Sequence, residues 1–174
     1  MLYMKKIDEN SEIREKIERL CRNAFPANER RSLAPLLSDR SGCGEAFAFF
    51  EEETFVGFAC LLSVWDISHL IYFAVCDSLR GKGYGTAALS LLRDEKRGYR
   101  LIADIEEVRE AANAVQRRRR RDFYLRAGYT ESEVVYDWRG ERYRILICGG
   151  TIDADEFEAF WREIERQNRV LAMY

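Results

Sequence analysis

The chain has 174 residues, 47% of them hydrophobic, which suffices for one sizeable core but is short for two full domains, so we expect a single domain over residues 1–174. Its 28 Lys and Arg residues nearly balance its 30 Asp and Glu residues, and the net charge of −2 provides no overall field to attract nucleic acid or an anionic membrane. The five cysteines lack C-x-x-C spacing, so we expect no metal and reduced cysteines. No apolar run is long enough for a signal peptide or membrane span, so we expect a cytoplasmic protein.

The first third of the chain is expected to begin with a strand at Leu2–Ile7. Residues Ser11–Ala24 have the apolar spacing of an amphipathic helix, with Asn10 or Ser11 as its cap. A second short helix is expected from Asn28 to Leu37, before a loop that contains two glycines.

Three strand-like runs follow in quick succession, at Ala46–Glu51, Thr54–Trp65 and Ser68–Val75. Their short connections predict an antiparallel meander. A helix over residues 83–97 and a strand at Tyr99–Glu106 come next.

The last third predicts a helix at Ala111–Ala127, closed by Gly128, and two strands at Tyr129–Trp138 and Arg142–Cys148. Asp153 should cap a final amphipathic helix. The order of elements predicts a mixed α/β fold of the α+β kind, with a mostly antiparallel sheet.

A glycine-rich turn lies between an apolar strand-like run and an apolar helix-like run. Glycines at alternate positions let backbone N–H groups approach an anion closely, and the N-terminus of the following helix adds partial positive charge. The turn is therefore expected to bind a pyrophosphate. Its residues are Arg80, Gly81, Lys82, Gly83, Tyr84, Gly85 and Thr86.

Two common phosphate-binding motifs do not fit this turn. The P-loop pattern fails because Lys82 lies between glycines, and the dinucleotide pattern G-x-G-x-x-G fails because Thr86 occupies its third glycine position. Asp104 lies about where the dinucleotide pattern has a ribose-binding acid, but the preceding strands indicate a meander and not repeated βαβ units.

The pattern that fits is Arg-x-x-Gly-x-Gly at residues 80–85, and with it the chain resembles the GCN5-related N-acetyltransferase (GNAT) superfamily. The resemblance extends to Ile71–Val75 before the turn and to Asp122–Tyr129 after the next strand. It implies a sheet of about seven strands flanked by four or five helices, with the fourth and fifth strands splayed apart.

The resemblance also implies acetyl-CoA as co-substrate, with its pyrophosphate on the glycine turn. The backbone around Phe73, Ala74 and Val75 would pair with the pantetheine arm, because a splayed strand offers unpaired N–H and C=O groups. The implied reaction is acetyl transfer by direct attack of a primary amine, on a small molecule or a protein.

Direct transfer needs a proton donor for the departing thiolate and an acceptor for the amine proton. Tyr124 occupies the tyrosine position that in this superfamily points toward the cofactor sulfur, and a phenol can donate to a thiolate. Its alternative role is packing.

Three residues are candidates for the base. Many relatives carry a glutamate where this chain has Ile71, so no simple transfer of that role is available. His69 is expected to share a strand face with Ile71, Phe73 and Val75, and histidine can accept a proton near neutral pH. Asp104 and Glu106 alternate on the neighbouring strand and are the other two candidates.

The run Arg117–Arg121 also fits an RNA-binding module, but nearby acidic residues favour a solvated, salt-bridged helix face. Relatives often have an asparagine seven residues before the tyrosine to bind the pantetheine arm. That position is Arg117 here, and Asn113 lies one turn earlier, so both are candidate cofactor contacts.

The acceptor is expected to meet the first two helices and the last hairpin. Candidate contacts are Phe25, Glu29 and Arg30 on one side and Tyr136 and Trp138 on the other.

Because Ile71 replaces a carboxylate, an inactive CoA-binding regulatory module is the alternative to an enzyme. Exposed strand edges and an aromatic final helix favour a homodimer.

Overall fold

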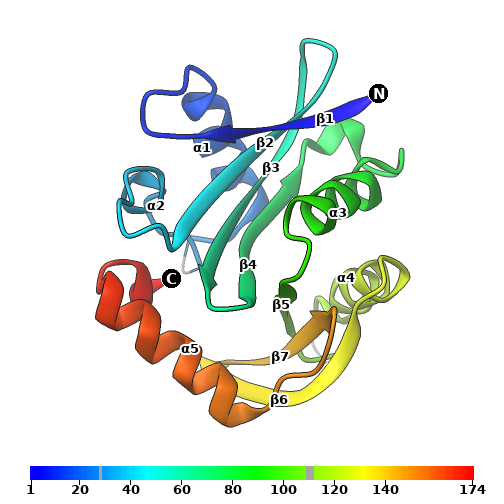
Figure 1. The fold of residues 1–174 in the computed structure, drawn as a ribbon. Coiled ribbons are helices and arrows are strands. Elements are labelled where there is room, and N and C mark those ends of the chain that lie inside the picture. Colours follow the sequence, from blue (N-terminus) through cyan, green and yellow to red (C-terminus); the bar gives the residue numbers. More distant parts are fainter. Residues whose placement is uncertain (28, 109–111) are drawn as a thin grey trace.

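The computed structural model describes residues 1–27, 29–108 and 112–174, and it has the mixed α/β architecture expected from the sequence (Figure 1). Seven strands form one sheet in the order β1-β2-β3-β4-β5-β7-β6, with only β4 and β5 running parallel. The strands are β1 (Leu2–Ile7), β2 (Gly44–Glu51), β3 (Thr54–Val64), β4 (Ile67–Val75), β5 (Arg100–Glu106), β6 (Thr130–Trp138) and β7 (Glu141–Cys148). The antiparallel meander β2-β3-β4 is therefore confirmed.

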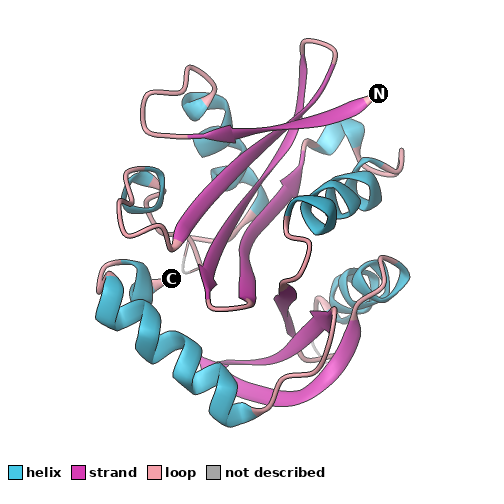
Figure 2. Ribbon diagram, viewed as in Figure 1, coloured by secondary structure: helices cyan, strands magenta, loops and turns pink. Residues whose placement is uncertain are grey.

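Within the described residues, five α-helices cover the two faces of the sheet (Figure 2). They are α1 (Arg14–Ala24), α2 (Ala34–Leu37), α3 (Tyr84–Glu95), α4 (Ala114–Arg126) and α5 (Ala154–Gln167). One apolar cluster joins α1, α2 and α5 to one face, and a second joins α3 and α4 to the other. No described helix is both long and apolar enough to span a bilayer.

The second predicted helix is much shorter than expected. Only Ala34–Leu37 is helical, and the predicted start at Asn28 lies outside the described residues. Pro35 fits the first turn of a helix but cannot continue one from upstream, because it lacks an N–H group and disfavours helical backbone before it.

The ends of the other helices follow local hydrogen bonding. The predicted cap at Asn10 or Ser11 was wrong, since α1 begins after Ile13 with no side-chain cap, and the Ser11 hydroxyl instead bonds Asp8. The Asp153 cap is confirmed, because its side chain and that of Glu156 form a reciprocal capping box.

Helix α4 ends as expected at a glycine. Gly128 has φ +92°, and the Tyr129 N–H donates back to the Tyr124 carbonyl, as in a Schellman motif. The predicted start of this helix at Ala111 lies outside the described residues.

The fourth and fifth strands diverge, as the family resemblance implied. Their pairing runs only from Ile67 opposite Arg100 to Leu70 opposite Ala103, although both strands continue further. Figure 1 shows β6 and β7 turned away from the β1–β4 part of the sheet. The splay leaves the edge of β4 after Leu70 without a strand partner on that side.

A β-bulge at Ile71 breaks the alternation of β4. Cys60 in β3 lies opposite Tyr72, and the next residue, Leu61, lies opposite Leu70, so Ile71 is the extra residue. The prediction that His69 shares a face with Phe73 and Val75 was therefore wrong. His69 packs against α5, while Phe73 and Val75 pack with the α3 and α4 cluster.

Candidate functional site

The larger of two neighbouring cavities, which we call the donor groove, has a volume of about 820 Å³ and lies beside the splayed end of β4. The last residues of β4, the glycine turn, and one face of α4 line it. Of the predicted cofactor contacts, those that line it are Phe73, Ala74, Val75, Arg80, Gly81, Gly83, Gly85, Thr86, Asn113 and Arg117.

The glycine turn presents backbone to this groove. Gly81 and Gly83 have φ +76° and +85°, where an L side chain would be strained. A Cβ on Gly85 would lie 3.1 Å from the Phe123 ring, so glycine allows the close approach of turn and helix. Gly83 caps α3 with no side-chain hydrogen bond, which leaves the first helical N–H groups available to an anion.

Two residues of the turn do not point into the donor groove. The Tyr84 hydroxyl donates a hydrogen bond to Glu51 at the end of β2, and neither Tyr84 nor Lys82 lines the groove. Any contribution from these two residues to an anion site would come from their backbone.

Arg117 is a buried member of the groove wall and not a free cation. Its side chain is 4% exposed, and it pairs with Glu106 at 3.3 Å and Glu141 at 3.2 Å. It also donates to the Asn113 side-chain oxygen at 2.8 Å, so Asn113 and Arg117 hold each other at the start of α4. Arg119 and Arg120 line the groove as well.

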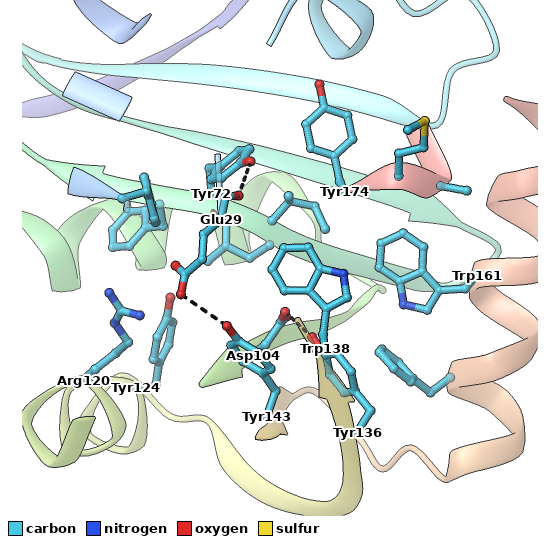
Figure 3. A pocket seen from close by; sticks show the side chains of 17 residues that line it. Glu29, Tyr72, Asp104, Arg120, Tyr124, Tyr136, Trp138, Tyr143, Trp161 and Tyr174 are labelled. Carbon is cyan, nitrogen blue, oxygen red and sulfur yellow. Dashed lines mark hydrogen bonds between the residues drawn. The ribbon is translucent and has the colours of Figure 1, made fainter. Parts of the chain in front are cut away.

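The second cavity, which we call the acceptor pocket, has a volume of about 340 Å³ (Figure 3). It lies between β4, the β6–β7 hairpin and α5, and Glu29, Asp104 and Arg120 are its charged residues. Ten aromatic side chains line it: Phe25, Tyr72, Phe73, Tyr124, Tyr136, Trp138, Tyr143, Phe157, Trp161 and Tyr174.

The two cavities meet at a shared wall made of Phe25, Glu29, Phe73, Arg120 and Tyr124. Tyr124 is 7% exposed, and among the described residues its hydroxyl has no hydrogen-bond partner. Burial raises the pKa of Tyr124 to about 12, so its hydroxyl stays protonated at neutral pH and can donate.

The predicted base candidates His69 and Asp104 form one pair, in which His69 is buried and the Asp104 side chain is 27% exposed. His69 is 0% exposed and lines neither cavity, and its Nε2 bonds the Asp104 carboxylate. The Tyr136 hydroxyl donates to the other Asp104 oxygen at 2.6 Å. Burial alone would raise the pKa of Asp104, but the attraction and hydrogen bond of His69 and the Tyr136 hydrogen bond lower it overall.

The third candidate, Glu106, lies in the donor groove and pairs with Arg117. The three candidates therefore differ in access: His69 is buried against α5 and bonded to Asp104, whereas Asp104 lines the acceptor pocket and Glu106 lines the donor groove.

Glu29 stands out as a titratable group on the shared wall, although the sequence suggested it only as an acceptor contact. The Tyr72 hydroxyl accepts from the Arg31 N–H at 2.9 Å and donates to the Glu29 carbonyl at 3.0 Å, which fixes this loop over β4. The pKa of Glu29 is raised overall, chiefly by burial and also by the negative charges of Glu106 and Asp104. The Tyr143 hydrogen bond and the positive charge of Arg120 lower it by less. No sequence motif marks such a residue.

The two neighbouring cavities could hold two different ligands side by side, an anionic one that contains amides in the donor groove and a cationic one in the acceptor pocket. Glycine-turn amides and the free edge of β4 suit the first, whereas carboxylates among aromatic rings suit the second. Among the described residues, no group of three or more His, Cys, Asp or Glu side chains is placed to hold a metal ion.

Solved structures with the same fold are acetyltransferases. A GNAT-family acetyltransferase from Bacteroides thetaiotaomicron matches with a TM-score of 0.77 and 22% identity, covering 94% of this chain and 96% of that one. The ribosomal-protein-S18-alanine N-acetyltransferase from Escherichia coli has a TM-score of 0.60 and 21% identity, with 89% and 97% covered. An aminoglycoside 6'-N-acetyltransferase complexed with coenzyme A has a TM-score of 0.65 and 17% identity, with 83% and 95% covered.

A search among curated proteins finds no match. The family model for the acetyltransferase (GNAT) family matches residues 11–129, which include β2–β5, the glycine turn and the whole of α4. The chain therefore belongs to the acetyltransferase (GNAT) family.

Proposed function

We propose that this protein is an acetyl-CoA-dependent N-acetyltransferase that acetylates a primary amine by direct attack. The observation that carries the proposal is the shared wall, where a groove suited to the acetyl donor and a pocket suited to an amine meet at Tyr124. Membership of the family and the coenzyme A bound to a solved structure of the same fold support it.

The residues of the donor groove fit coenzyme A. N–H groups of the glycine turn at the start of α3 would hold the pyrophosphate, and the free edge of β4 at Phe73–Val75 would pair with the pantetheine amides. Asn113 and Arg117 would contact the same arm from α4. The co-substrate supplies a thioester whose acetyl group can pass to an amine.

In the proposed reaction the neutral amine nitrogen bonds to the acetyl carbonyl carbon, and the bond from that carbon to sulfur breaks. Tyr124 donates its hydroxyl proton to the departing sulfur, and a carboxylate in the pocket takes the proton that the amine loses. Glu29 and Asp104 both lie in that pocket, and His69 and Tyr136 are positioning residues that hold the Asp104 carboxylate.

The acceptor of this protein is an amine of a small molecule or a protein. Of the similar structures, one acts on an alanine of a ribosomal protein and one on an aminoglycoside, so the fold serves both kinds of acceptor. A cytoplasmic location and a homodimer stay predictions from the sequence.

Release of the coenzyme A thiol, measured across a panel of amines, tests the proposal. We expect thiol release that depends on the amine, and calorimetry should detect acetyl-CoA binding that Gly83→Glu abolishes, because a charged side chain would enter the turn. The proposal fails if the folded wild-type protein does not bind acetyl-CoA, or if Gly83→Glu binds it equally well.

The alternative is a CoA-binding regulatory module without catalysis. It is favoured by Ile71, which lines the acceptor pocket where many relatives carry a carboxylate. Donor binding without turnover across a broad amine panel would support this alternative.

A further inference from the structure

The acceptor pocket is small and mostly aromatic. Its volume of about 340 Å³ is at the lower end for ligand sites, and rings from four elements line it: Tyr72, Tyr136, Trp138, Tyr143, Phe157 and Trp161. Figure 3 shows Trp138, Tyr143 and Tyr136 coming from the hairpin side and Trp161 from the helix. Such walls bind flat or cyclic hydrocarbon groups well.

The charge of the pocket favours a cation. Two carboxylates, Glu29 and Asp104, face one guanidinium, Arg120. Both Asp104 oxygens already accept hydrogen bonds, one from His69 and one from Tyr136. Glu29 accepts through Oε1 from Tyr143 at 3.2 Å, which leaves its second oxygen for a ligand.

The cavities also indicate which end of a ligand goes where. Glu29 and Tyr124 line both cavities, whereas Trp138 and Trp161 line only the acceptor pocket. A reacting nitrogen must lie at the shared wall, so the rest of the acceptor extends among the tryptophans.

We propose that the acceptor is a compact primary amine with an aromatic or cyclic hydrocarbon body, whose nitrogen binds between Glu29 and Tyr124 and whose ring packs against Trp138 and Trp161. This inference rests on the proposed function. Glu29 is then the residue that accepts the amine proton: the ammonium N–H bond breaks, the proton passes to the free Glu29 oxygen, and the neutral amine remains.

Two other kinds of amine fit the pocket poorly. An aminoglycoside would bring several ammonium and hydroxyl groups to a pocket whose Asp104 carboxylate and Tyr72, Tyr136 and Tyr143 hydroxyls are already engaged in hydrogen bonds, and burying those groups unpaired is costly. A peptide terminus would bury backbone amides in the same way.

The test compares 2-phenylethylamine with ethylamine, kanamycin and an alanine-initiated peptide as acceptors. We expect kcat/KM for 2-phenylethylamine to exceed that for ethylamine by about tenfold or more, the effect of burying one aromatic ring. Higher kcat/KM for kanamycin or the peptide would overturn the inference and leave the proposed function standing.

Matched tryptophan variants locate the ring. Trp138→Ala should raise KM for 2-phenylethylamine about tenfold and leave that for ethylamine nearly unchanged, because only the first amine has a ring to lose contact. Trp65→Ala is the control, since Trp65 is 59% exposed in the β3–β4 turn and lines neither cavity. Equal effects of Trp138→Ala on both amines would contradict the placement.

Binding without turnover is measured by tryptophan fluorescence, because Trp138 and Trp161 lie in the pocket. We expect 2-phenylethylamine to change the fluorescence. We expect 2-phenylethanol, which lacks the charge, to bind with about tenfold lower affinity. In Glu29→Gln the two compounds should bind with similar affinity. Binding with no turnover of any amine would support the ligand class while the proposed function fails. No binding of 2-phenylethylamine at millimolar concentration would overturn the inference.

Discussion

The Tyr143 hydroxyl donates a hydrogen bond of 3.2 Å to the Glu29 carboxylate, joining β7 to the loop after α1. The two residues are 114 positions apart in the chain. Because β7 lies beyond the splay, this bond crosses from one part of the sheet to a loop held on the other part by Tyr72. The geometry of the acceptor pocket therefore depends on both parts.

Tyr143→Phe should move the acidic limb of the kcat/KM profile to higher pH. The Tyr143 hydrogen bond stabilises the Glu29 carboxylate, so its loss should raise the pKa of Glu29 further. In the wild type we expect the limb above the usual glutamate range, because burial and the charges of Glu106 and Asp104 raise the pKa of Glu29 more than the Tyr143 hydrogen bond and Arg120 lower it. Glu29→Gln should abolish the limb. An unchanged profile in both variants would exclude Glu29 as the base.

Tyr124→Phe should lower kcat by about a hundredfold or more, the usual contribution of one general acid, and leave acetyl-CoA affinity unchanged. The pKa of Tyr124 is raised to about 12, so its protonated form persists and no basic limb below about pH 10 should come from this residue. Pre-steady-state thiol release and calorimetry separate the two effects. A wild-type rate in Tyr124→Phe would assign this residue to packing alone.

Lys96→Met should destabilise the fold by about 3 kcal/mol, because it leaves the Glu45 carboxylate, only 14% exposed, without one of its two lysine partners. Chemical denaturation measures the change. Arg162→Met, which breaks the pair with Glu158 that is exposed on both sides, is the matched control and should leave the free energy of unfolding nearly unchanged.

The ion pair of Lys96 and Glu45 also predicts how the stability of the fold depends on pH. Burial alone would raise the pKa of Glu45, but hydrogen bonds and charges from Lys96 and Lys6 lower it overall. Its contribution is therefore fully present above the unfolded glutamate pKa of about 4.3 and is lost as pH falls through the lower folded value. Glu45→Gln should flatten the fall in melting temperature over this acidic range, and a fall as steep as in the wild type would contradict the assignment.

Gly57→Ala should both destabilise the protein and weaken donor binding. A Cβ at Gly57 would lie 2.3 Å from the Ala74 carbonyl oxygen, so β3 and β4 would have to separate beside the donor groove. We expect a cost of about 2 kcal/mol or more. Gly42→Ala, where a Cβ meets nothing within 4 Å but φ is +83°, controls for backbone strain and should leave acetyl-CoA affinity unchanged.

Much of the fold and the donor groove could be predicted because their determinants are local. Apolar periodicity located the strands, Asp153 marked the start of α5, and the glycine turn identified the end of the groove. Tyr124 was predicted from the family resemblance, through the tyrosine of the pattern Phe-Tyr-x-x-x-Gly-Tyr at residues 123–129, and it lines the donor groove.

The acceptor side could not be predicted in the same way, because its contacts join distant residues. The hydrogen bond between His69 and Asp104 depends on strand pairing, and the face of β4 on which His69 lies depends on a bulge that no local pattern reveals. Glu29 becomes notable only when Tyr72 and Tyr143 fix it on the shared wall.

The extra residue at Ile71 divides β4 into two segments of opposite phase. Before it, His69 faces α5 and Leu70 packs with α3 and α4; after it, Tyr72 packs on the side of α5, and Phe73 and Val75 pack with α3 and α4. Deleting one residue there would exchange the two faces, turning the Tyr72 hydroxyl away from the loop that carries Glu29. The length of the strand at this point thus keeps Tyr72 under the loop that carries Glu29 while Phe73 and Val75 stay on the side of α3 and α4.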